Sequence, residues 1–301
     1  MGAVRSAVGV LAATAALGCV ALSGCSAPPT PRVQPTVAAV VDREPVDVAK
    51  VAVPPPAPAV DLTGLTVVDP KHVVAGLPGL GDRTQLASED PALGRWRTAV
   101  VVRDTAAYDE PGGTAVGVLP AQTLGVSTVV PVVETAPGWL RVMVAARGAL
   151  PSADAARVNE RTAWVRTVDT RAAGTDWRIT VDTAAQTLTV DDGTGRVVHP
   201  VIATGSPSRP TPRGPQFVVG TFWEEPGSVT PRVVLLSSQS ETMDAYDRVT
   251  GTSATAIHTT TLASRGEVSN GCVRVADDVL DVLWRAVPPG TLVLVEPTGG
   301  R

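Results

Sequence analysis

The chain has 301 residues, with 25 basic and 29 acidic side chains and a formal net charge of −4. This length is sufficient for one large domain or two modest ones, each with a buried core. The slight excess of acidic side chains excludes the broad basic surface with which proteins bind nucleic acid, so no nucleic-acid partner is expected.

The N-terminus is predicted to be an export signal. An apolar run at residues 8–22 follows Arg5, and it is too short for a membrane-spanning helix. The small residues before Cys25 resemble the cleavage site of bacterial lipoproteins, in which this Cys is diacylated. We therefore predict that residues 1–24 are a lipoprotein signal peptide and that Cys25 is lipidated, which anchors the exported protein to the outer face of the cytoplasmic membrane, in the cell envelope. The alternative is an ordinary secretory signal followed by an incidental cysteine.

Two segments without a regular pattern come next. Residues 25–60 are rich in Pro and Ala, so we predict an extended linker. Residues 61–95 contain short apolar pieces broken by Gly and Pro, and we predict an irregular segment.

Residues 96–171 are predicted to form a β domain. The stretches around Trp139 and Trp164 resemble bacterial SH3-like domains, which implies a small β-barrel of the kind that accompanies cell-wall enzymes. The two Trp side chains are candidates for a ligand groove, although core packing is the favoured role. Runs rich in β-branched residues, separated by Gly and Pro, predict strands at 98–102, 114–119, 138–144 and 162–166.

A second β-rich unit follows from residue 176. Asp277 is expected to cap a helix over 278–285, because Val279, Leu280 and Leu283 lie on one face of it. A hairpin turn is expected at 191–193. Alternating apolar and polar residues predict strands at 177–182, 186–190, 197–203, 216–220 and 291–295.

Cys272 is the candidate nucleophile. Of the three cysteines, Cys19 lies in the signal and Cys25 is predicted to carry lipid, so Cys272 has no partner for an internal disulfide. An unpaired thiol in an exported protein is either buried and inert or kept for its reactivity.

His258 is the candidate base, since a thiol reacts as thiolate and an imidazole can take its proton. The other histidines are poorer candidates, because His72 lies in the irregular segment and His199 precedes a proline near a strand end. Gly271 lets the backbone approach a substrate closely. No zinc site is expected from Cys272 and His258, because no third or fourth ligand is near in sequence, and no cofactor is expected.

In order, His258 and the run from Ser269 to Arg274 closely resemble the L,D-transpeptidase (YkuD-type) catalytic domain. This domain has a His followed by Ser/Thr-His-Gly-Cys and usually an Arg. Three departures are Asn270 in place of the second His, Thr259 in place of a Gly, and a short His–Cys loop. The resemblance extends over 176–297, through residues 179–182, 186–190, 201–205, 211–214 and 289–291. The chain is therefore predicted to be mainly β, with a small SH3-like β-barrel followed by an L,D-transpeptidase-type β-sandwich with a short helix.

The resemblance implies acyl transfer on peptidoglycan stem peptides. Cys272 would attack the carbonyl before the terminal D-Ala of a donor tetrapeptide, and the resulting thioester would pass to the side-chain amine of an acceptor diamino acid, giving a 3→3 cross-link. His258 would move protons in both steps. Carbapenems, which acylate relatives at this Cys, are expected to inhibit the enzyme.

The resemblance also implies roles for the neighbouring residues. The amides of Gly271 and Cys272 would stabilise the oxyanion, and a backbone carbonyl near Thr259 would orient the imidazole. Arg274 would hold a donor carboxylate or order the loop, with simple structural pairing as the alternative. Ser269, Asn270, Tyr246 and Met243 complete the predicted substrate-binding set, the last two in a region that forms a lid in relatives.

Three other functions stay open or are disfavoured. A carboxypeptidase of the same fold would use water to resolve the thioester, and the sequence does not separate it from a transpeptidase. A papain-like wall peptidase is disfavoured because it places Cys before His. A non-catalytic wall-binding lipoprotein has no need for both Cys272 and His258.

Overall fold

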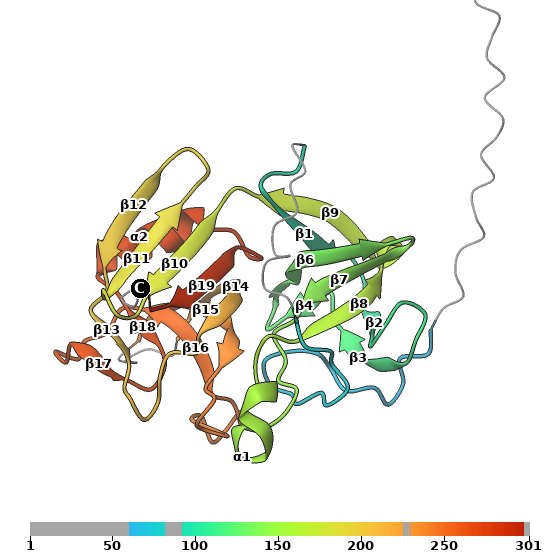
Figure 1. Cartoon of the computed structure of the whole chain (residues 1–301), viewed down its shortest axis with the longest axis horizontal. Helices are drawn as coiled ribbons and strands as arrows, with labels where there is room; N and C mark the ends of the chain where they lie inside the picture. The colour runs from blue at the N-terminus through green and yellow to red at the C-terminus, as the bar shows by residue number, and fades with distance from the viewer. Residues whose placement is uncertain (1–59, 82–91, 225–227, 229, 298–301) are drawn as a thin grey trace, which may run out of the picture. The chain divides into compact units, whose positions relative to one another are not determined.

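The computed structural model describes residues 60–81, 92–224, 228 and 230–297 (Figure 1). The predicted signal peptide, Cys25 and nearly all of the predicted linker lie outside this range. Residues 57–301 form one compact unit. The fold is mainly β, as predicted. None of the helices in the described ranges is long and apolar enough to cross a membrane.

The first sheet is antiparallel throughout and has seven strands in the order β3-β2-β8-β7-β6-β1-β9. The sequence predicts four of them and misses β2, β6 and β9. β2 and β9 are rich in Ala and Thr, so their pairing rather than their composition makes them strands. The resemblance to SH3-like domains remains a prediction. The strands are β1 (Trp96–Val101), β2 (Thr105–Tyr108), β3 (Ala115–Leu119), β6 (Val129–Ala136), β7 (Trp139–Met143), β8 (Thr162–Arg166) and β9 (Thr170–Thr175).

Short elements connect these strands. A two-stranded hairpin precedes β6, and a helical turn separates β7 from β8. Trp164 is buried beside Ala106 and Tyr108, while Tyr108 meets the half-buried Trp139 edge to face, so Trp164 packs in a core rather than in an open groove. The connecting elements are β4 (Gln122–Thr123), β5 (Val126–Ser127), α1 (Pro151–Asp154), η2 (Ala155–Arg157) and η3 (Thr167–Asp169).

Residues 60–81 contain no strand, in agreement with the predicted irregular segment, yet they belong to the core of the first sheet. Isolated bridges join Val67 to Val118 and Val73 to Arg147. The buried apolar side chains of the segment fall in the same cluster as Val101, Leu119 and Val142 of the sheet. The predicted boundary at residue 95 is therefore not a boundary of this core. The contributing side chains are Val68, Val74, Leu77 and Leu80.

The second sheet has ten strands in the order β12-β11-β10-β19-β14-β15-β16-β18-β13-β17. The long strand β14 joins two halves, because residues 214–217 pair with β19 and residues 218–223 pair with β15. The strands are β10 (Arg178–Asp182), β11 (Thr187–Asp191), β12 (Arg196–Pro200), β13 (Ala203–Gly205), β14 (Gly214–Trp223), β15 (Arg232–Gln239), β16 (Ala254–His258), β17 (Gly266–Ser269), β18 (Val273–Arg274) and β19 (Leu292–Glu296).

The helix α2 (Asp277–Ala286) covers this core with Val279, Leu280 and Leu283, as its predicted apolar face requires. The predicted capping role of Asp277 is wrong. Ala276 occupies the N-cap without a side-chain hydrogen bond, and Asp277 begins the first turn. The predicted strand 197–203 is confirmed over 197–200 but does not continue to 203, because the stretch divides into β12 and β13 after Pro200.

Candidate active site

The alternation of side chains along the strands places several predicted site residues on one face of the second sheet. β16 and β18 are parallel neighbours, with Ile257 opposite Val273 and His258 opposite Arg274. Ile257 and Val273 are fully buried in the core beneath α2. Because side chains alternate along a strand, His258 and Arg274 point to the other face, and so does Cys272 two residues before Arg274.

That face lines a cavity of about 840 Å³. Its wall comes from β15, β16, the segments around β18, the connection between β15 and β16, and the residues around the end of β14. Three further lining residues, Pro70, Lys71 and Leu124, come from the part of the chain that precedes the second sheet. The predicted residues that the cavity brings together are Tyr246, His258, Ser269, Asn270, Cys272 and Arg274.

The His258 side chain is buried, and its tautomer follows from one contact. Its Nδ1 lies 2.6 Å from the backbone carbonyl oxygen of Thr259. A carbonyl only accepts hydrogen bonds, so Nδ1 carries the proton and Nε2 is the lone-pair nitrogen of the neutral ring. Thr259 thus orients the imidazole through its backbone, and its side chain is not needed for this contact.

The electrostatics of the site favour a neutral thiol and a neutral imidazole. Burial raises the pKa of Cys272 above its ordinary 9.0, against the opposing effects of a backbone hydrogen bond from Ala256 and of the Arg274 charge. Burial also lowers the pKa of His258 below 6.5, and Arg274 adds to this effect while the Thr259 carbonyl opposes it. Cys272 is a free, half-buried cysteine. No hydrogen bond joins its sulfur to the ring in the described part of the chain.

A tight turn presents Cys272. Gly271 has φ of +112°, a conformation that other residues rarely adopt. The hydroxyl of Ser269 donates to the Cys272 carbonyl at 2.6 Å and accepts from the Gly271 amide at 3.1 Å. Ser269 therefore shapes the turn. The Gly271 amide can serve as the predicted oxyanion donor only if its hydrogen bond to the Ser269 hydroxyl breaks.

Arg274 and Asn270 flank the turn on the cavity side. Arg274 donates from Nη1 to the Ser264 hydroxyl at 3.1 Å, and its buried Nε has no hydrogen-bond partner. A buried donor without a partner is costly, so this side chain is suited to take up a ligand acceptor. Asn270 accepts a hydrogen bond from Arg209 at 2.7 Å and so ties the turn to the loop before β14.

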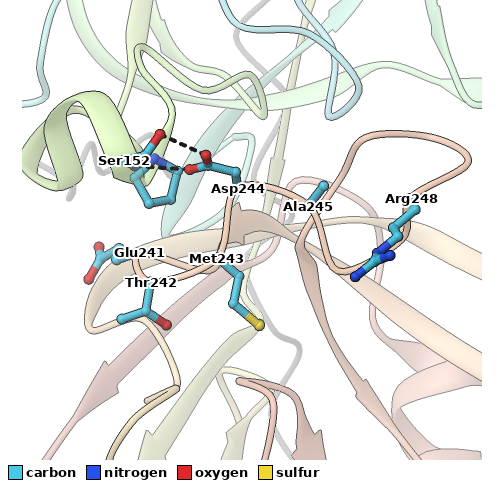
Figure 2. Close-up of a pocket in the computed structure, with 8 residues that line it drawn as sticks. Ser152, Glu241, Thr242, Met243, Asp244, Ala245 and Arg248 are labelled. Atoms are coloured by element: carbon cyan, nitrogen blue, oxygen red, sulfur yellow. Dashed lines mark hydrogen bonds between the residues drawn. The ribbon is translucent and has the colours of Figure 1, made fainter.

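The two predicted lid residues separate in the structure. Tyr246 lines the cavity that also contains His258 and Cys272, and it is 64% exposed. Met243 instead lines a second, open cavity of about 530 Å³, together with Ser152, Asp244 and Arg248 (Figure 2). The structure therefore does not bring Met243 to the cavity that His258 and Cys272 line.

Sequence reasoning missed the contributions of the N-terminal segments to this cavity. Lys71 is one of two lysines in the chain, whose other basic residues are all Arg, and this scarcity is the only signal it offers. Pro70 and Leu124 lie in segments without a motif. Their place in the cavity depends on contacts between residues more than 100 positions apart.

Comparison with known proteins agrees with the resemblance drawn from the motifs. Residues 176–295 match the family described as the L,D-transpeptidase catalytic domain (YkuD). No curated protein matches the chain.

Solved structures give distant matches. An L,D-transpeptidase from Mycobacterium smegmatis is 15% identical, with a TM-score of 0.33 over 52% of this chain and 90% of that chain. L,D-transpeptidase 3 from Mycobacterium tuberculosis, in complex with a faropenem-derived adduct, is 15% identical, with a TM-score of 0.35 over 52% of this chain and 91% of that chain. The catalytic domain of the Enterococcus faecium enzyme is 21% identical, with a TM-score of 0.28 over 40% of this chain and 96% of that chain.

Proposed function

We propose that this chain, whose residues 176–295 carry an L,D-transpeptidase catalytic domain, is a peptidoglycan L,D-transpeptidase that works through a thioester on Cys272. The observation that carries the proposal is the state of His258. Its Nδ1–H is committed to the Thr259 carbonyl, which leaves Nε2 as a base in the cavity that Cys272 also lines. A structural histidine or an inert buried thiol requires no such arrangement.

The first step acylates the enzyme. Nε2 takes the thiol proton as the sulfur of Cys272 attacks the carbonyl before the terminal D-Ala of the donor tetrapeptide. The S–C bond forms, the C–N bond breaks, and the imidazolium returns the proton to the departing amine. Because the resting pair is neutral, proton transfer accompanies attack rather than preceding it.

The second step releases the enzyme. The side-chain amine of an acceptor diamino acid attacks the thioester and gives a proton to Nε2 as the new C–N bond forms. The C–S bond breaks, and the imidazolium returns the proton to the thiolate. The product is a 3→3 cross-link. If water attacks instead, the same site is a carboxypeptidase, and the nature of the product separates the two.

Two cationic side chains support a carboxylate-bearing substrate. Arg274 and Lys71 both line the cavity, and a stem peptide ends in a carboxylate that a cation can hold. The cavity of about 840 Å³ is within the range of small-ligand sites. Carbapenems, which are acyl donors to thiols, are the proposed inhibitors.

The test is the mass of the intact protein after incubation with a carbapenem. The unchanged protein should gain one adduct, and Cys272→Ala should gain none while keeping its unfolding temperature. His258→Gln should slow acylation by roughly 10²- to 10⁴-fold, the range expected for a general base. His199→Gln is the matched control, because His199 lies on β12 and does not line the cavity. An adduct on Cys272→Ala would refute the nucleophile assignment.

We further propose that Cys25 carries the lipid that holds the enzyme at the outer face of the membrane. The support is the apolar run and the small residues that precede this Cys. Replacing Cys25 with Ala should move the protein from the membrane fraction to the soluble fraction and abolish labelling by a fatty-acid analogue. Unchanged labelling would refute the lipoprotein assignment.

A further inference from the structure

Residues 240–253 form a long connection between β15 and β16, called here the 240–253 loop. It leads directly into the strand that carries His258. Much of the loop is at the surface, with Tyr246 64% and Val249 96% exposed. The loop also lines the catalytic cavity, through Tyr246, Asp247, Thr250, Thr252 and Ser253.

Arg147 reaches this loop from the first sheet. It follows β7 and is only 2% exposed. Its Nη1 donates to the Asp244 carbonyl at 2.6 Å, and its Nη2 donates to the Gly251 carbonyl at 2.9 Å. One planar guanidinium thus joins two points of the loop that are seven residues apart and fixes their separation.

The backbone of Arg147 is itself held in place. Its carbonyl accepts from the Val74 amide at 2.7 Å, and its amide donates to the His72 carbonyl. The irregular segment 60–81, which supplies Lys71 to the cavity, therefore also braces the residue that holds the 240–253 loop.

Two further contacts connect the loop to the same part of the chain. Ser152 donates to the Asp244 carboxylate from its amide at 2.9 Å and from its hydroxyl at 2.6 Å, as Figure 2 shows. Asn159 both donates to the Gln239 carbonyl and accepts from the Gln239 amide, each at 2.8 Å, at the base of the loop. The loop is thus held at its base and within its span.

We propose that Arg147 is a positioning residue that keeps the 240–253 loop in the shape required for substrate to bind. The inference rests on the proposed function of the cavity. An exposed loop loses conformational entropy when it is ordered, and the bonds from Arg147 offset that loss. A buried guanidinium is costly unless its donors are satisfied. The two loop carbonyls satisfy Nη1 and Nη2 of Arg147, whereas its Nε has no hydrogen-bond partner among the described residues, so the loop bonds are the side chain's compensation for burial.

The test compares three variants of the full chain by steady-state kinetics and by hydrogen exchange. Arg147→Met removes both bonds to the loop, and Arg147→Lys restores at most part of them. Arg141→Met is the matched control, because Arg141 also donates to backbone carbonyls, at Gly79 and Leu80, but does not contact the loop. Alkylation of Cys272 by iodoacetamide reports on the thiol itself.

Arg147→Met should raise KM for the donor tetrapeptide by roughly tenfold or more, since small displacements of positioning groups have effects of this size. Amides of residues 240–253 should exchange faster, while kcat and the alkylation rate stay within about twofold. Arg147→Lys should lie between the two proteins, and Arg141→Met should match the unchanged one.

Unchanged KM and loop exchange in folded Arg147→Met would overturn the proposal, and so would equal changes in Arg141→Met. If Arg147→Met does not fold, Arg147→Lys, which keeps the charge but cannot reach both carbonyls at once, carries the comparison: faster loop exchange and a higher KM support the proposal, and unchanged values overturn it. Loop exchange does not depend on turnover. A protein without transpeptidase activity but with faster exchange in Arg147→Met would therefore contradict the proposed function and leave the role of Arg147 supported.

Discussion

Replacing Gly271 with Ala tests how the turn presents the nucleophile. A Cβ at this position would meet the Thr255 methyl carbon at 3.4 Å, the Pro210 carbonyl at 3.5 Å and the Pro212 ring at 3.9 Å, which are ordinary contacts. The effect of the change therefore comes from the backbone, whose φ of +112° is strained for alanine. Strain of this kind costs about 1–3 kcal/mol.

The turn at residue 271 can respond to this backbone strain in two ways. If the turn keeps its shape, the unfolding temperature should fall by about 2–4 °C for each kcal/mol. If the turn relaxes, the Cys272 sulfur moves, and a displacement of about 1 Å is expected to slow acylation by roughly 10²-fold. Both quantities are measured on the same preparation, by thermal unfolding and by the rate of carbapenem adduct formation.

Gly138→Ala is the control for this experiment. Gly138 has φ of +81° in the turn between β6 and β7, and no atom lies within 4 Å of its hypothetical Cβ. It should lower stability to a similar extent without changing the acylation rate. The reasoning is refuted if Gly271→Ala keeps both the stability and the acylation rate of the unchanged protein.

Four other predictions concern charge and packing. Because the pKa of His258 is lowered from 6.5, its base form persists at lower pH, so acylation should decline only below pH 6.5 in a pH–rate profile. As pH drops below 6.5, His258 binds a proton more readily in the unfolded chain than in the folded one, so the free energy of unfolding should fall. Above pH 9.0 the Cys272 thiol loses its proton more readily in the unfolded chain, so the free energy of unfolding should fall there as well. Arg274→Met should move the acid limb of the pH–rate profile to higher pH, since the charge of Arg274 helps to keep His258 neutral; an unmoved limb would contradict this. Leu280→Ala, at a fully buried position of α2, should lower the free energy of unfolding by about 2–5 kcal/mol in denaturant titrations, and a loss below 1 kcal/mol would show that α2 does not seal the core.

Much of the fold follows from local patterns. The alternation at Ile179 and Val181, and the apolar face of Val279, Leu280 and Leu283, predict β10 and α2 because residue spacing alone decides which side chains share a face. The strands that carry the site, β15 to β18, are not predicted. β17 and β18 are very short, and they become strands only through pairing with distant partners.

As with the strands, only some features of the candidate site could be predicted from the sequence. Cys272, His258 and Gly271 are proposed from the sequence, because their chemistry and order are visible there. The separation of Tyr246 from Met243, and the engagement of the Gly271 amide by Ser269, are not visible. These depend on the path of the backbone through a turn and a loop.

The sequence by itself determined which residues are the candidates for the reaction and which family motif they resemble. Only the tertiary structure decided what surrounds them: that segment 60–81 joins the core of the first sheet, that Lys71 enters the cavity, and that Arg147 reaches Asp244 and Gly251. The reason is physical. Whether a side chain can serve as a nucleophile or a base, and whether a residue can adopt a left-handed backbone, is set by the residue itself. A contact between residues 147 and 244 depends on the packing of the whole chain.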